Sequence, residues 1–184
     1  ITAELAGISE GLKTGSRHLA LYDFIKAKTL FAESIKATKP KFAEHHSEFA
    51  WINARHPLLY LKLEEEGGEI VPLNIKITEE QRMIIISGPN AGGKSVTLKT
   101  VALNQYMWQC GMLVCCEAES EMALFEELFI DIGDNQSIDN NLSSYSSHLK
   151  AMKHFINHAT ERTLFLIDEL GSGTDPQFGG PIGE

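Results

Sequence analysis

The eight residues Gly88–Ser95, GPNAGGKS, decide the fold of this 184-residue chain. They fit the pattern G-x-x-x-x-G-K-[ST], in which a glycine-rich loop joins a buried strand to a helix. The apolar run Met83–Ile86 before the loop predicts the strand, and the residues from about Lys94 onward predict the helix. A glycine-rich turn that binds nothing is the alternative interpretation. The strand before the loop and the helix after it favour a phosphate-binding loop instead.

The residue types in this loop suit the binding of a nucleotide. Glycines let the backbone curl until successive N–H groups converge on an anion, and the start of the following helix adds further donors. Lys94 would reach the β and γ phosphates, and the Ser95 hydroxyl would hold Mg²⁺. We therefore predict that a nucleotide is bound together with Mg²⁺. The predicted nucleotide-binding residues of the loop are Gly88, Pro89, Asn90, Ala91, Gly92, Gly93, Lys94, Ser95 and Val96.

Composition narrows the class of protein. An apolar content of 43% and a charged content of 22% are typical of a globular domain with one sizeable core. No apolar run approaches the ~18 residues that span a bilayer, and the first residues do not resemble a signal peptide. Cys110, Cys115 and Cys116 lack zinc-site spacing, which predicts buried, reduced thiols in a cytoplasmic protein. The net charge of −9 argues against DNA binding by this segment itself.

The first half of the chain predicts connector helices and then short strands. Helical spacing over the first 12 residues stops at Gly15, and a second helix is expected over about residues 16–37. Its buried stripe would contain Leu21, Phe24, Phe31 and Ile35. Strand-like pieces follow at residues 49–52, 58–63 and 73–77, with residues 64–69, EEEGGE, as a hairpin turn.

The second half alternates strands with helices. Residues 124–132 and 163–168 read as strands, and residues 144–159 read as a helix that buries Leu149, Met152 and Ile156. This alternation predicts an α/β fold with a mostly parallel sheet.

A second motif, Asp168 followed by Glu169, ends the last of these strands. In phosphate-loop enzymes an acid at the end of a neighbouring strand binds Mg²⁺. A second carboxylate beside it can orient or deprotonate an attacking water. For this pair taken alone, the alternative interpretation is that two acidic residues simply follow the end of a strand and have no catalytic role. Its occurrence downstream of a complete phosphate-binding loop favours the catalytic interpretation.

Three motifs in this order resemble the ATPase of the MutS mismatch-repair family: GPNAGGKS, LSSYSSHL (142–149) and LIDELGSGTDP (166–176). The segment ARHPLL (54–59) is similar to that family's Arg-His-Pro segment, and DIGDNQSI resembles its type-two branch. The resemblance implies a phosphate-loop NTPase of the ABC ATPase type. Its mostly parallel central sheet would carry an antiparallel β subdomain and follow connector helices. Residues 1–40 would form the helical connector, and residues 41–184 the ATPase domain, truncated at its carboxyl end.

The resemblance also assigns roles to residues. Asn90 and the catalytic Lys94 would touch the terminal phosphates, Ser95 and Asp168 would lie at the metal, and Glu169 would be the catalytic base. Ser143 would meet the γ phosphate bound by the opposite subunit, so that two ATP molecules lie between two copies of the chain. The partners implied are a second copy, DNA bound through domains absent here, and ribosomes, with no membrane. The implied process is DNA repair or control of recombination.

Departures from the family pattern leave some roles open. Val96 stands where many ABC ATPases have threonine, so only its backbone can donate. Gln109 and Glu117 are both candidates for the glutamine-loop residue, and Ile70 or Val71 for the contact with adenine. Two other functions are alternatives to the ATPase. One is another ABC ATPase head, from chromosome maintenance or a transporter, and the other is an ATP-dependent dimerisation module with little turnover. The isolated chain is expected to hydrolyse ATP poorly or not at all.

Overall fold

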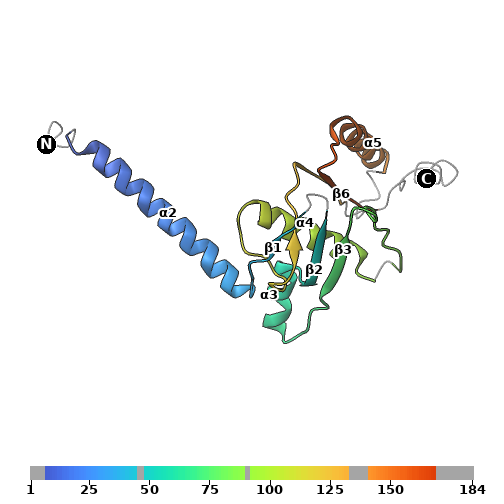
Figure 1. Cartoon of the computed structure of the whole chain (residues 1–184), viewed down its shortest axis with the longest axis horizontal. Coiled ribbons are helices and arrows are strands. Elements are labelled where there is room, and N and C mark those ends of the chain that lie inside the picture. Colours follow the sequence, from blue (N-terminus) through green and yellow to red (C-terminus); the bar gives the residue numbers. More distant parts are fainter. Residues whose placement is uncertain (1–6, 45–47, 90–91, 133–140, 169–184) are drawn as a thin grey trace.

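A long helix, α2 (Ser9–Ser34), projects from a mixed α/β body (Figure 1). The computed structural model describes residues 7–44, 48–89, 92–132 and 141–168, with side chains from residue 149 onward in the last range. The predicted break at Gly15 is wrong, because α2 continues through it. A glycine inside a helix costs only about 1 kcal/mol relative to alanine, and good helix formers such as Leu19, Ala20 and Leu21 follow this one.

Only the carboxyl end of α2 is anchored to the body. Ile35, the residue that caps the helix, is fully buried, and Phe31 packs against the same core. Leu21 and Phe24 are exposed, so the predicted buried stripe holds only for its last two members. The reason is geometric: the helix leaves the body, and its first turns meet no other described element (Figure 1).

The main sheet is mixed, and its strands have the order β1-β4-β2-β3. β1 pairs with β4 in parallel, whereas β2 pairs with both β4 and β3 in antiparallel fashion. In the β2–β3 pair Trp51 lies opposite Ile75, and the apolar face of both strands turns to the core. The predicted strands at residues 49–52 and 73–77 are confirmed. The bounds are Lys41–Phe42 for β1, Phe49–Ala54 for β2, Leu73–Ile77 for β3 and Glu121–Met122 for β4.

Residues 58–63, predicted as a strand, belong to helix α3 (Pro57–Glu66). The backbone N–H of Leu59 donates to Nδ1 of His56 at 3.3 Å, which caps the start of the helix. Pro57 occupies the first turn, where its missing N–H costs nothing. Gly67 ends the helix in the left-handed conformation, with φ of 71°. The predicted hairpin turn at residues 64–69 is therefore the carboxyl end of this helix.

A β–α–β unit forms the other part of the body. β5 (Glu127–Asp131) pairs in parallel with β6 (Thr163–Ile167), and α5 (Asn141–His158) lies between them in sequence. This part of the predicted alternation is confirmed. The predicted buried stripe of α5 is wrong, because Ile156 is 79% exposed and Leu149 is also exposed. Phe155 is buried instead, since its ring stacks on that of Phe129 in β5 at a centroid distance of 4.6 Å.

The strand predicted at Met83–Ile86 does not form. These residues pair with no strand of the described chain, and Met83 and Ile85 are 79% and 83% exposed. An apolar run becomes a strand only where a neighbouring strand satisfies its backbone groups. Among the described residues the central sheet is consequently mixed rather than mostly parallel.

One hydrophobic core joins these parts. Helix α4 (Lys94–Gln109) buries Val101 and Trp108 in the same cluster as Trp51 of β2 and Leu166 of β6. Cys115 and Cys116 are buried as predicted, whereas Cys110 is exposed. No helix in the described ranges has both the length and the apolar character that crossing a membrane requires.

Candidate functional site

The glycine loop reaches α4 through a tight turn. The N–H of Gly92 donates to the carbonyl of Pro89 at 2.8 Å. A Cβ on Gly92 would lie 2.9 Å from that same carbonyl oxygen, closer than real Cβ atoms come. Gly93 has φ of 83°, in the left-handed region that glycine tolerates best, and it caps the start of α4. Asn90 and Ala91 lie outside the described residues.

Lys94 and Val96 lie in the first turn of α4. The Lys94 ammonium donates to the carbonyl of Gly88 at 2.6 Å, so the side chain reaches from the end of the loop back to its beginning. Val96 is partly exposed and offers only its backbone N–H. The first N–H groups of any helix have no partner within it, and they carry the positive end of the helix dipole. This end of α4 therefore suits an anion.

Ser95 and Asp168 come together although 73 residues separate them in sequence. The Ser95 hydroxyl donates to Oδ2 of Asp168 at 2.7 Å, a distance typical of a hydroxyl bonded to a carboxylate. Asp168 directly follows β6, and its N–H donates to the carbonyl of Asp131 at 2.9 Å. The two predicted motifs thus meet where the parallel strands β5 and β6 end.

Asp131 is the residue at this position that sequence reasoning missed. It is the last residue of β5 and lies opposite Ile167 of β6. Its carbonyl fixes the backbone of Asp168, the residue that follows Ile167. The signal was present in the sequence, because Asp131 begins the motif DIGDNQSI and ends an apolar strand.

Two other predicted site residues have no described side chain. Glu169 lies outside the described residues. Ser143 lies in the first turn of α5, and its side chain is also outside the described part.

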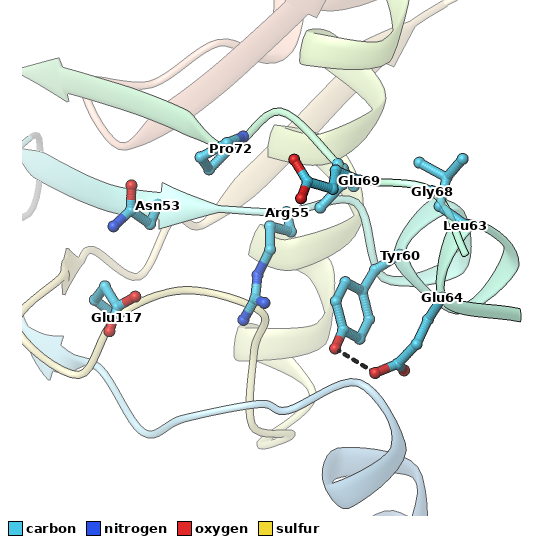
Figure 2. A pocket seen from close by; sticks show the side chains of 10 residues that line it. Asn53, Arg55, Tyr60, Leu63, Glu64, Gly68, Glu69, Pro72 and Glu117 are labelled. Atoms are coloured by element: carbon cyan, nitrogen blue, oxygen red, sulfur yellow. Dashed lines mark hydrogen bonds between the residues drawn. The ribbon is translucent and has the colours of Figure 1, made fainter. Parts of the chain in front are cut away.

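The two candidates for the glutamine-loop residue occupy different environments. Oε1 of Gln109 accepts hydrogen bonds from the N–H of Phe125 and from the side chain of Gln105, both at 3.0 Å. Gln109 is therefore bound into the scaffold that holds the end of α4. Glu117 instead lines a cavity of about 450 Å³ beside β2 and α3 (Figure 2). Only Glu117 is placed to meet a ligand in this cavity.

The cavity contains the arginine of the Arg-His-Pro segment. The Arg55 guanidinium lies over the ring of Tyr60, with its carbon 4.8 Å from the ring centroid (Figure 2). The Tyr60 hydroxyl donates to Glu64 at 2.9 Å, and Lys36, just after α2, donates to the same carboxylate at 2.8 Å. These bonds lower the pKa of Glu64 and raise that of Lys36. This network, in which Tyr60 is buried and Lys36 and Glu64 are exposed, links the end of α2 to α3.

The two candidates for the contact with adenine also lie in different environments. Ile70 lines this cavity, whereas Val71 is 91% exposed. None of the residues that line the cavity belongs to the glycine loop. The structure therefore brings Ile70 together with Arg55 and Glu117, but not with Lys94 or Ser95. Burial lowers the pKa of His56, the residue that caps the start of α3.

Comparison with known proteins decides the family. The family described as MutS domain V matches residues 84–183, more than half of the chain. The chain belongs to the MutS family. The match begins in the extended run before the glycine loop and includes α4, β5, α5 and β6. The family predicted from the motifs is confirmed.

The MutS relatives with the printed name Endonuclease MutS2 support the type-two branch. The protein from Finegoldia magna is 44% identical over 164 residues, which cover 89% of this chain and 20% of the relative. The proteins from Shouchella clausii and Pediococcus pentosaceus are 42% and 41% identical over 182 residues, covering 99% of this chain and 22% of each relative. The chain therefore spans about a fifth of the length of these curated relatives. The matches over 182 residues include helix α2.

Proposed function

We propose that the chain is the ATP-binding and ATP-hydrolysing core, of the ABC type, of a MutS2-like protein. Residues 1–40 form the connector to the rest of that protein, and residues 41–184 form the ATPase domain. The observation that carries this proposal is the 2.7 Å hydrogen bond between Ser95 and Asp168. It joins the phosphate-binding loop to the acid at the end of β6, and phosphate-loop NTPases need both at one place.

The oxygen atoms at this point suit Mg²⁺. A hydroxyl and a carboxylate are the hard donors that Mg²⁺ prefers, together with phosphate oxygens and water. Ser95 and Asp168 would hold the ion, which neutralises charge on the β and γ phosphates when it is bound. The ammonium of Lys94 would exchange the Gly88 carbonyl for a phosphate oxygen. The backbone N–H groups of the residues from Gly88 to Val96, Pro89 excepted because it has none, would surround the phosphates.

Hydrolysis would require two copies of the chain. Glu169, next to Asp168, would hold the attacking water as the general base. Ser143, in the first turn of α5, would present donors to the γ phosphate bound by the second copy. ATP would then lie in a homodimer, and its binding would be coupled to mismatched or branched DNA, or to stalled ribosomes, through domains absent from this chain. We place this activity in the cytoplasm.

Nucleotide binding tests the loop. Titration calorimetry with Mg²⁺-ATP should show at least about tenfold weaker binding for Lys94→Ala, equivalent to about 1.4 kcal/mol, because a cation that meets phosphate is lost. Lys13→Ala on the exposed part of α2 is the matched control, since it removes the same charge far from the loop. Equal affinities for Lys94→Ala and the unmodified chain would refute the proposed site.

Turnover in the complete protein tests the two-copy mechanism. Glu169→Gln keeps the shape of the side chain and removes the base, so the rate should fall about 10²–10⁴-fold while ATP stays bound. Ser143→Arg should prevent closure of the pair and leave ATP binding by each copy nearly unchanged. Full activity of Glu169→Gln would exclude the mechanism. So would an unchanged rate per subunit where the protein is monomeric.

A further inference from the structure

The last two turns of α5 carry a pair of exposed histidines that the nucleotide site does not use. His154 and His158 are four residues apart and therefore lie on one face of the helix. Their ring centroids are 4.1 Å apart, and the ring planes differ by 32°. Two histidines at this helical spacing can present their imidazoles to one metal ion.

Neighbouring groups hold both rings in place. Nδ1 of His158 lies 2.8 Å from the carbonyl oxygen of His154. A carbonyl oxygen can only accept, so Nδ1 of His158 carries the proton, and in the neutral ring Nε2 carries the free lone pair. Metal-binding histidines usually donate their second ring N–H in this way. The ring of His154 meets that of Phe129 in β5 at a centroid distance of 5.6 Å and an angle of 67°.

We propose that His154 and His158 form a two-histidine site for a borderline divalent cation, with Zn²⁺ as the first candidate. Imidazole nitrogens suit Zn²⁺, Ni²⁺ and Cu²⁺, whereas Mg²⁺ prefers oxygen. The site is therefore distinct in chemistry from the pair Ser95 and Asp168. It goes beyond the proposed ATPase function and does not depend on it.

The number of ligands sets the character of the site. In the described ranges no group of three or more side chains of metal-binding type comes together. Structural zinc sites have four protein ligands, so a site with two leaves positions for water and exchanges its metal. The competing explanation is that the histidines only interact with the last carbonyls and the dipole of α5. That explanation predicts an effect on helix stability and no metal binding.

The test is Zn²⁺ titration of the chain without a polyhistidine tag, after treatment with a chelator. We expect one Zn²⁺ to bind with an affinity that falls about tenfold or more in His154→Gln and in His158→Gln. His18→Gln, which changes a lone exposed histidine on α2, should leave this affinity unchanged. Excess Mg²⁺ should not displace the metal. Equal Zn²⁺ affinity in the unmodified chain and both α5 variants would overturn the proposal.

A second readout does not depend on the variants. In the unmodified chain, the side-chain ¹⁵N resonances of His154 and His158 should shift together on addition of Zn²⁺, whereas those of His18 should not. If the resonances of the pair do not move at one equivalent of Zn²⁺, the histidines serve only the end of the helix, and the metal site is refuted.

Discussion

The hydrogen bond between Ser95 and Asp168 can be removed from either side, and this gives the sharpest test of the site. Ser95→Ala deletes the hydroxyl 2.7 Å from the Asp168 carboxylate. Hydrogen bonds to charged groups contribute about 1.5–3 kcal/mol, and the half-buried position favours the lower end. We expect the free energy of unfolding to fall by about 1.5 kcal/mol. Asp168→Asn keeps an accepting oxygen but loses the charge, which roughly halves the bond, so about 0.7 kcal/mol should be lost.

The double variant separates this bond from other effects. Urea unfolding of Ser95→Ala, Asp168→Asn and the double variant should give a coupling energy of about 0.5–1 kcal/mol, as expected for residues in direct contact. Thr97→Ala is the matched control. Its hydroxyl, in the same turn of α4, donates to the Gly93 carbonyl at 3.0 Å and not to Asp168. Its effect should therefore add to that of Asp168→Asn.

The same variants test the metal. In Mg²⁺, Ser95→Ala should weaken ATP binding, because one of the two protein oxygens proposed for the ion is lost. With EDTA present, the affinities of Ser95→Ala and the unmodified chain should agree. Strict additivity in unfolding would refute the hydrogen bond. An equal loss of affinity with and without Mg²⁺ would refute the proposed role of Ser95 at the metal.

Four further predictions concern the loop, its support and the cysteines. Gly93→Ala should lower the free energy of unfolding, measured in urea, by about 1–2 kcal/mol. This loss comes from backbone strain alone, since a Cβ at Gly93 meets nothing within 4 Å. Gly92→Ala should instead weaken ATP binding, measured by calorimetry, because the turn must open to make room for the Cβ. Asn104→Ala should lower the free energy of unfolding, measured in urea, by about 2–3 kcal/mol, because the buried N–H of Cys115 loses its hydrogen-bond acceptor. Burial raises the pKa of Cys115 to about 11. The thiol therefore stays protonated at pH 8, and labelling followed by mass spectrometry should find Cys110 modified first.

The sequence was sufficient for the start of α4 and for the β5–α5–β6 unit. Glycine tolerates the left-handed conformation found at Gly93 and the close contact found at Gly92, so the glycine pattern indicates where the turn ends and α4 begins. Parallel strands end at one edge of a sheet, so Asp131 and Asp168 come together at the ends of β5 and β6 once the β–α–β unit is recognised. The closeness of Ser95 to Asp168 depends in addition on the core that Leu166 of β6 shares with α4.

Other predictions failed where local pattern and tertiary contact disagree. The run at residues 58–63 is apolar enough for a strand, but His56 and Pro57 open a helix and Gly67 closes it. Those capping signals could be recognised in the sequence. The buried face of α5 could not, because the choice between Phe155 and Ile156 as the buried residue depends on contact with the ring of Phe129. The sequence of α5 alone does not include that ring.

The failed strand at Met83–Ile86 shows how the site is held. The loop follows this exposed run, which pairs with no described strand, so its support comes from the other side, through α4. There Val101 and Trp108 pack into the core, and the buried Asn104 ties the helix to the carbonyl of Arg55 and the N–H of Cys115. Leu166 of β6 shares this core, which places Asp168 relative to α4. Ser95 therefore bridges two units that a common core has already aligned, and its hydroxyl reports on that alignment as well as on the proposed metal site.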